Sequence, residues 1–150
     1  MHRAGFDSPV GPLTVDYFDD AIVAMRWQQS APCTSEIARA TGQQLEDYFS
    51  GRRQVFDLPL APRANAFQTR FYAALCAIPF GETRTYGELA AELDVSAQAI
   101  GQACGANPIP IFIPCHRVLG ANGLGGFSGG GGIEAKVALL RLEGAAGLLI

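Results

Sequence analysis

A thiol and an imidazole stand side by side in the segment Pro114–Val118, whose sequence is Pro-Cys-His-Arg-Val. A cysteine is a good nucleophile only as a thiolate, and a neighbouring histidine is a common means of generating one. The apolar run Ile109–Ile113 leads into this segment and indicates that the sulfur of Cys115 is sheltered from solvent. The same pair also fits a buried cysteine that serves only as a small apolar core residue. Cys-His adjacency alone leaves both interpretations open.

The size and composition of the chain favour one folded unit or two small ones. The chain has 150 residues, of which 49% are hydrophobic, enough to fill a core. No apolar run is long enough to span a bilayer, and the first residues lack the apolar region of a secretory signal. We therefore expect a cytoplasmic protein with no membrane partner.

The cysteines, the histidines and the net charge argue against disulfides, a metal site and nonspecific binding to a polyanion. The four cysteines are widely spaced, which favours reduced thiols over disulfides; they are Cys33, Cys76, Cys104 and Cys115. The two histidines have no metal-ligand spacing, so we expect no metal and no cofactor. A net charge of −3 argues mildly against nonspecific attraction to a polyanion.

The first part of the chain has the pattern of a small α/β domain, residues 1–62. Strands and turns are predicted between Phe6 and Trp27, and a helix over Ser35–Phe49 that ends at Ser50-Gly51. A short extended piece, Gln54–Leu58, follows. Pro59 and Pro62 then mark a linker. The expected architecture is a small antiparallel sheet plus a helix.

The second part, residues 63–150, is predicted to be mainly helical. An apolar stripe at Phe67, Phe71 and Leu75 indicates the first helix, and a final helix is expected from Glu134 to about Leu142. Between them, Tyr86–Leu93 and Ser96–Gly105 are short helices separated by a tight turn, with Ser96 as N-cap. Such a pair, at about residues 86–106, fits either a helix-turn-helix or a plain helical hairpin.

The ordered motifs of the chain resemble those of the O6-alkylguanine-DNA alkyltransferases, also called methylated-DNA–protein-cysteine methyltransferases. The principal motif is Asn107-Pro108, followed by the apolar run and Pro-Cys-His-Arg-Val. The other motifs that carry the resemblance are Ser8–Leu13, Phe67-Gln68, Ile78–Glu82, Tyr86, Phe127–Gly130 and Leu142–Gly144. A Cys-His dipeptide is weak evidence, whereas these pieces occur in the family's order over essentially the whole chain.

The resemblance implies DNA repair by direct reversal. Such a protein flips an O6-alkylguanine, and by the same expectation an O4-alkylthymine, out of double-stranded DNA, because the target atom is hidden in the base stack. It then moves the alkyl group irreversibly to one cysteine, in a single-turnover reaction that inactivates the protein. No obligate protein partner is implied, and we expect a monomer.

Matched to the family's motifs, the active-site loop, residues 114–118, supplies the acceptor Cys115 and the base His116. The resemblance implies that His116 acts through a water molecule and is oriented by Glu143. Tyr86 would help to rotate the nucleotide and donate a hydrogen bond toward the leaving guanine. From the residues alone, Glu143 also fits a solvated acid at a helix end, and Tyr86 a half-buried aromatic at a helix start.

Further roles are implied by the same match. Asn107 would brace the turn between the helix-turn-helix and the active-site loop, although Asn-Pro is also an ordinary turn starter. Val118 and Ser128 would line the guanine pocket through backbone groups, while Arg117 would pair inside the fold. The glycine run Gly129–Gly132 lengthens the loop before the last helix, which bears on the role of Ser128. The other three cysteines are interpreted as structural.

The predicted DNA-contacting helix departs from the family's pattern. Gln98 stands where the family usually has an arginine that fills the space of the flipped base, and no Lys or Arg occurs between Arg84 and Arg117. Such a helix lacks the counterion release that normally supplies DNA affinity. The residues predicted to contact DNA are Gln98, Ala99, Ala103, Gly105, Tyr86 and Arg84, with Arg70 and Lys136 as further candidates for phosphate contacts.

Alternative functions follow from these departures. A lesion-binding module would keep the fold, transfer weakly and flag damage for other repair machinery; relatives of that kind replace the cysteine, whereas this chain keeps Cys115, His116 and Glu143 together. A thiol that accepts alkyl groups from a non-duplex substrate is a second alternative, motivated by the uncharged helix. A cysteine hydrolase is disfavoured, because the sequence has no visible oxyanion-hole signature.

Overall fold

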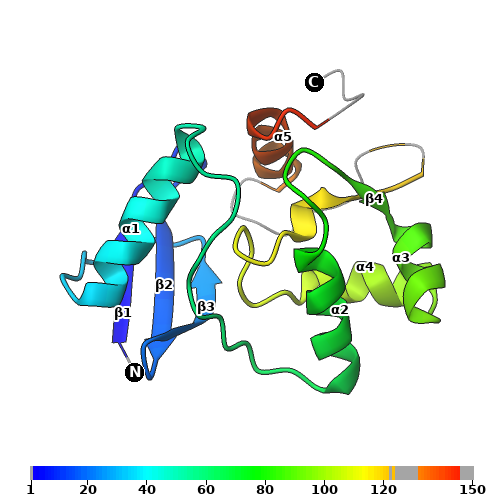
Figure 1. The fold of residues 1–150 in the computed structure, drawn as a ribbon, viewed down its shortest axis with the longest axis horizontal. Coiled ribbons are helices and arrows are strands. Elements are labelled where there is room, and N and C mark those ends of the chain that lie inside the picture. The colour runs from blue at the N-terminus through cyan, green and yellow to red at the C-terminus, as the bar shows by residue number, and fades with distance from the viewer. Residues whose placement is uncertain (1, 122, 124–131, 146–150) are drawn as a thin grey trace. The chain divides into compact units, whose positions relative to one another are not determined.

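The chain folds into two units, Met1–Arg63 and Ala64–Ile150, which we call unit 1 and unit 2. A computed structural model describes residues 2–121, 123 and 132–145. Unit 1 contains a three-stranded sheet and one helix, whereas unit 2 contains helices around short extended segments (Figure 1). The predicted fold class, a small α/β part followed by a mainly helical part, is confirmed. No helix among the described residues is long and apolar enough to cross a bilayer.

The sheet of unit 1 is antiparallel, with its strands in the order β1 (His2–Phe6), β2 (Leu13–Phe18) and β3 (Ala21–Arg26). The central strand, β2, is the most buried of the three. Asp19 and Asp20 join β2 to β3 with φ of 50° and 59°, the left-handed backbone that a two-residue hairpin turn requires. Strand β1 was missed by the sequence-based prediction, because its polar residues leave only Ala4 fully buried.

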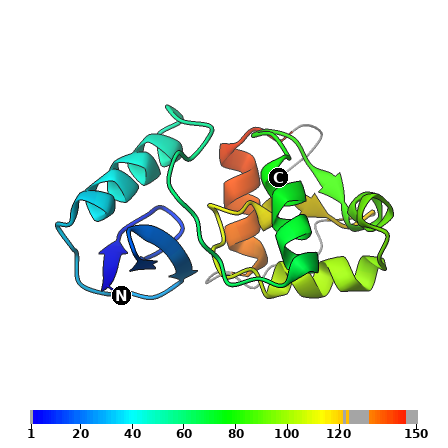
Figure 2. The same cartoon turned by 60° about the horizontal axis from the view of Figure 1, so that its bottom comes forward.

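Helix α1 (Glu36–Phe49) lies along this sheet, as Figures 1 and 2 show. Ser35 caps it by accepting a hydrogen bond from the amide of Ala38, and the Tyr17 hydroxyl donates to Thr41 Oγ1 at 2.9 Å. The predicted helix is therefore confirmed. The segment predicted as a short extended piece, Gln54–Leu58, is irregular and contains bends, and Gln44 holds the backbone of Asp57 by two hydrogen bonds.

Unit 2 contains four α-helices among its described residues: α2 (Ala66–Cys76), α3 (Tyr86–Leu93), α4 (Ala97–Gly105) and α5 (Ile133–Leu142). Side chains cap the first three in chain order: Asn65 caps α2, Thr85 caps α3 and Ser96 caps α4. Of these caps, only Ser96 was predicted from the sequence, yet the predicted helices agree with the structure to within a residue or two.

The turn between α3 and α4 is only a few residues long. Asp94 ends α3 in the left-handed conformation, with φ of 58°, and Ser96 starts α4. The two helices are in contact and run in clearly different directions, as Figures 1 and 2 show. This arrangement fits a helix-turn-helix better than a plain helical hairpin.

Two very short strands link the start of α3 to the segment after Cys115. The sequence did not reveal either strand. Strand β4 (Arg84–Thr85) pairs in parallel with β5 (Val118–Leu119), with Arg84 opposite Val118. Strand β5 follows directly after the single 3-10 turn η1 (Cys115–Arg117), and β4 runs directly into α3. This pairing therefore places the start of α3 next to the segment that carries Cys115.

The turn before β4, Pro79–Glu82, should contribute to the stability of unit 2 through the conformation of Gly81. Pro79–Glu82 is closed by a hydrogen bond from the amide of Glu82 to the carbonyl of Pro79, and Gly81 has φ of +84°. A Cβ atom on Gly81 would also lie 3.2 Å from the carbonyl oxygen of Glu143. We expect Gly81→Ala to lower the free energy of unfolding by about 1–2 kcal/mol in urea titration, because alanine disfavours this φ.

The matched control is Gly101→Ala. Gly101 lies inside α4, and a Cβ atom there would meet nothing within 4 Å. This substitution should leave stability unchanged or raise it by up to about 1 kcal/mol. Equal effects of the two substitutions would contradict the role assigned to the turn.

Candidate active site

Cys115 lies at the start of η1 and is only 5% exposed. Its amide donates to the carbonyl of Ile113 at 2.8 Å, and its own carbonyl accepts from the amide of Val118. The apolar run Ile109–Ile113 before it is buried throughout. The expectation that the sulfur is sheltered is confirmed.

The loop that leads to Cys115 is held in an unusual backbone conformation. Ile111 has φ of 72°, which is rare for a β-branched residue and costs on the order of 1–3 kcal/mol. A hydrogen bond of 2.9 Å from the amide of Ile113 to the carbonyl of Ile109 closes the loop around it. Asn107 then fixes both ends: its Nδ2 donates to the carbonyl of Ile113 at 2.8 Å, and its Oδ1 accepts from the amide of Ile109 at 3.0 Å. The side chain of Asn107 thus braces this turn.

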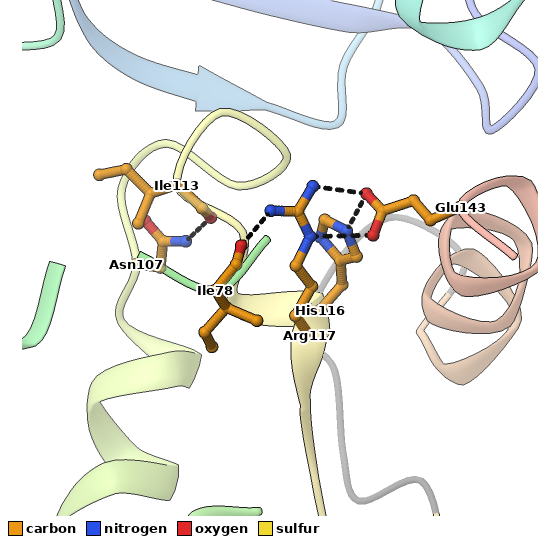
Figure 3. A network of polar contacts seen from close by, with 6 residues as sticks. All are labelled: Ile78, Asn107, Ile113, His116, Arg117 and Glu143. Atoms are coloured by element: carbon orange, nitrogen blue, oxygen red, sulfur yellow. Dashed lines mark hydrogen bonds and ion pairs between the residues drawn. The ribbon is translucent and has the colours of Figure 1, made fainter. Parts of the chain in front are cut away.

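The two residues that follow Cys115, His116 and Arg117, belong to a buried network of polar and charged groups (Figure 3). His116 Nε2 lies 2.8 Å from Glu143 Oε2, and Arg117 donates to both oxygens of the same carboxylate at 2.9 Å. Arg117 also donates to the carbonyl of Ile78 at 2.7 Å. The three side chains are almost fully shielded from solvent. Arg117 therefore pairs inside the fold, as expected, and Glu143 is not a solvated acid.

The network sets the protonation state of His116. Burial lowers the pKa of His116 below its ordinary value, although its contact with Glu143 acts in the opposite direction. We regard the lowering as dominant, because Arg117 already compensates the charge of Glu143. A neutral imidazole that donates from Nε2 to Glu143 carries its lone pair on Nδ1. That nitrogen has no hydrogen-bond partner among the described residues and can accept a proton.

Opposing effects act on the thiol itself. Burial raises the pKa of Cys115 above its ordinary value, while a hydrogen bond from the Asn107 side chain and the charge of Lys136 work to lower it. A desolvated thiolate is a strong nucleophile once formed but is costly to form. The site therefore depends on the groups that favour the anion.

Tyr86 and Lys136 lie together beside this loop. Tyr86 is the first residue of α3 and is half-buried, and the amine of Lys136 lies 5.7 Å from the centre of its ring. Lys136 Nζ also donates to the carbonyl of Val118 at 2.6 Å. Lys136 is 0% exposed, so the expectation that it contacts a DNA phosphate was wrong. Its position in a helix of mixed composition gave no sign of this burial.

The predicted DNA-contacting residues of α4 lie apart from the buried network. Gln98 and Gly105 are exposed, and Ala99 and Ala103 are half-buried. Arg84 and Arg70 are exposed too, and Arg70 donates to the carbonyl of Leu93 at 3.1 Å. Ser128 lies outside the described residues, so its predicted role in the pocket stays a prediction.

The structure adds two residues to the surroundings of Cys115: Tyr72, which the sequence did not single out, and Cys104, which was interpreted only as structural. Tyr72 in α2 and Cys104 in α4 both interact electrostatically with Cys115, which helps to raise the pKa of each. Cys104 is half-buried and its pKa is raised to about 12, so it is a neutral thiol, whereas Cys76 is exposed. No group of three or more potential ligands could hold a metal ion among residues 2–121, 123 and 132–145.

Comparison with known proteins identifies relatives of the whole chain. The sequence profile described as "6-O-methylguanine DNA methyltransferase, DNA binding domain" matches residues 66–145. The methylated-DNA–protein-cysteine methyltransferase of Methanosarcina barkeri is 48% identical over 159 aligned positions, covering 95% of this chain and 97% of that protein. The protein of the same name from Mycobacterium tuberculosis is 42% identical, covering 95% of this chain and 92% of its own.

Solved structures give the same result. The O6-methylguanine methyltransferase of Mycobacterium tuberculosis matches with a TM-score of 0.84 at 39% identity, over 99% of this chain and 96% of that one. The OGT protein of the same organism, crystallised in complex with DNA, matches with a TM-score of 0.86 at 41% identity, over 96% and 93% of the two chains. Since these matches extend over nearly the full length of both partners, the chain belongs to the methylated-DNA–protein-cysteine methyltransferase family.

Proposed function

We propose that this protein repairs alkylated DNA by moving the alkyl group of an O6-alkylguanine onto the sulfur of Cys115. The observation that carries the proposal is the buried thiol next to a neutral imidazole, which Glu143 and Arg117 hold in place. Family membership supplies the class of substrate, and a relative of similar structure has been crystallised with DNA.

The proposed reaction transfers one alkyl group and one proton. Nδ1 of His116 accepts the thiol proton of Cys115 through a water molecule, since Nε2 is engaged with Glu143. The S–C bond forms as the C–O6 bond breaks, and the electron pair of the broken bond stays on the guanine. Overall the alkyl group passes from oxygen to sulfur, and the proton passes from sulfur to guanine. A thioether is a poor alkyl donor, so each protein molecule reacts once.

Tyr86 is placed to serve the leaving base. It starts α3 immediately after β4, whose pairing with β5 holds it near the segment that carries Cys115. We infer that its hydroxyl donates a hydrogen bond to the guanine as negative charge develops on the ring, a form of transition-state stabilisation. Val118, whose carbonyl faces Lys136, and Ser128 complete the proposed guanine pocket.

Double-stranded DNA is the proposed partner, with α4 entering it and Gln98 filling the space of the flipped base. Unit 2 has only five basic residues, and two of them, Arg117 and Lys136, are buried. Arg84 and Arg70 are therefore the proposed phosphate contacts nearest in sequence to α3 and α4. Phosphate contacts supply most of the affinity of DNA-binding proteins, so we infer weak binding that depends little on salt.

The first prediction concerns the acceptor. Incubation with a duplex containing O6-methylguanine should add the mass of one methyl group to the peptide that holds Cys115, measured by intact and peptide mass spectrometry. Cys115→Ala should bind the same duplex and accept nothing, while Cys76→Ala, which changes an exposed cysteine, should accept one methyl group.

The outcomes of this experiment separate the candidate functions. An unmodified protein that still binds the lesion duplex would indicate a lesion-binding module. Modification by free O6-benzylguanine but not by the duplex would indicate an acceptor for non-duplex substrates. Methylation of another cysteine in place of Cys115 would refute the assignment of the site.

The second prediction concerns the uncharged helix. Gln98→Arg should raise affinity for a lesion duplex and steepen its salt dependence by about one unit of slope, because the added cation releases about one more counterion from the DNA. The measurement is duplex binding by fluorescence anisotropy over a range of salt concentrations. Gln43→Arg, on the exposed side of α1, makes the same charge change and should leave the slope nearly unaltered. Equal slopes for the protein and Gln98→Arg would exclude Gln98 from the DNA-contacting surface.

The third prediction concerns acid stability. The pKa of His116 is lower in the folded protein than in the unfolded chain, so the unfolded state binds the extra proton first as the pH falls. The free energy of unfolding should therefore decline below about pH 6.5, by up to about 1.4 kcal/mol per pH unit from this group alone. Urea titrations across this range should show that His116→Gln lacks this component. A stability difference between the two proteins that does not change with pH would contradict a buried neutral His116.

A further inference from the structure

Lys136 is an unusual residue for this chain. It is the only lysine in the sequence, and all the other basic residues are arginines. It is also 0% exposed in the middle of α5, although lysine is among the residues least often fully buried. A buried cation costs free energy unless its charge is used, so a role in packing alone does not account for it.

The contacts of Lys136 tie it to the candidate site. Its Nζ donates to the carbonyl of Val118 at 2.6 Å, directly after the turn that carries Cys115 and His116. The same amine lies 5.7 Å from the centre of the Tyr86 ring. One side chain therefore reaches from α5 to both the loop of the proposed acceptor and the proposed contact of the leaving base.

The electrostatics of these groups are reciprocal. The charge of Lys136 lowers the pKa of Cys115, and the thiolate forms of Cys115 and Cys104 in turn raise the pKa of Lys136 against the effect of its burial. Lys136 also lowers the pKa of His116, which keeps that imidazole neutral. The other ionisable groups that act on Cys115, His116 or Lys136 are Tyr72 from α2, Cys104 from α4, Arg117 from η1 and Glu143 after α5.

We propose that Lys136 is a positioning residue for alkyl transfer, a role that rests on the proposed function. Its ammonium group stabilises the Cys115 thiolate and orients Val118 and Tyr86 around the substrate. A compact point charge suits this place better than the wide guanidinium fork of arginine. Lys136 loses this anionic partner when the sulfur becomes an uncharged thioether. The proton balance of the transfer is unchanged, because Lys136 keeps its proton throughout.

The first test measures the electrostatic interaction between Lys136 and Cys115 in the absence of any substrate. Protein labelled with carbon-13 at the lysine ε-carbon gives the NMR signal of Lys136 alone, since the chain has no other lysine. Titration should show a lower pKa for Lys136 in Cys115→Ala than in the unaltered protein. Cys76→Ala, which removes an exposed thiol, should titrate like the unaltered protein. Identical titrations of the unaltered protein and Cys115→Ala would overturn the proposal.

The second test removes the charge. Lys136→Met fills a similar volume without charge, and Lys136→Gln keeps a donor for the carbonyl of Val118. In both, the pH at which methyl methanethiosulfonate modifies Cys115 at half-maximal rate should rise by about one unit or more. Methyl transfer from a lesion duplex at neutral pH should then fall about tenfold in a single-turnover assay, since the thiolate fraction falls by that factor.

The controls separate this role from a structural one. Arg141→Gln removes an exposed charge from the same helix and should leave the pH profile of Cys115 unchanged. The charge-free variants should keep the melting temperature, because replacing a buried charge by an apolar side chain is often neutral or stabilising. An unshifted pH profile in a folded variant overturns the proposal. If neither Lys136→Met nor Lys136→Gln folds, the titration of Lys136 in the unaltered protein and in Cys115→Ala still tests the proposal.

The two proposals fail in different ways. A protein whose Cys115 accepts nothing from any O6-alkylguanine would refute the proposed function, yet the lysine titration and the thiol profile would still report the interaction of Lys136 with Cys115. A protein that transfers the alkyl group, but whose Lys136 and Cys115 titrate independently, would refute the role of Lys136 alone.

Discussion

The carboxylate of Glu143 is the group on which the candidate site depends. It accepts hydrogen bonds from Arg117 on both oxygens and lies 2.8 Å from Nε2 of His116, with no access to solvent. These bonds fasten the end of α5 to the turn that carries Cys115, and Arg117 extends the connection to the carbonyl of Ile78. Removing a single partner would leave an uncompensated charge in a low-dielectric interior, which costs several kcal/mol. The network therefore both holds the loop in place and selects the tautomer of His116.

Burial of Cys115 makes its thiolate a stronger nucleophile but also makes that thiolate harder to form. A thiol that is 5% exposed ionises reluctantly, so the fold must supply compensating groups around it. Asn107 and Lys136 both favour the thiolate, and they come from separate segments of unit 2: one follows α4, and the other lies within α5. The loop before Cys115 also accepts local strain, since Ile111 keeps an unfavourable φ within the turn that Asn107 braces.

The proposed DNA-binding side of unit 2 contrasts with this interior. Two of the positively charged side chains of unit 2, Arg117 and Lys136, are buried in its interior. Helix α4, by contrast, presents Gln98 and small residues to solvent. Affinity for the DNA backbone must then come from few contacts, and close approach of a helix with small side chains becomes more important than attraction at a distance. A single-use protein of this kind would rely on chemistry after contact more than on tight binding before it.

The sequence by itself determined the helices of unit 2, the family and the residues of the proposed reactive pair. These follow from local signals: the cap at Ser96, apolar periodicity, and ordered motifs around Cys115 and His116. It did not reveal β1, β4 or β5, since strands so short or so polar are defined by their partners rather than by their own residues. Only the tertiary structure decided that Glu143 is buried against Arg117 and that Lys136 is buried beside Val118 and Tyr86 instead of exposed toward DNA. The physical reason is that the environment of a charge depends on packing between distant segments, which no local pattern encodes.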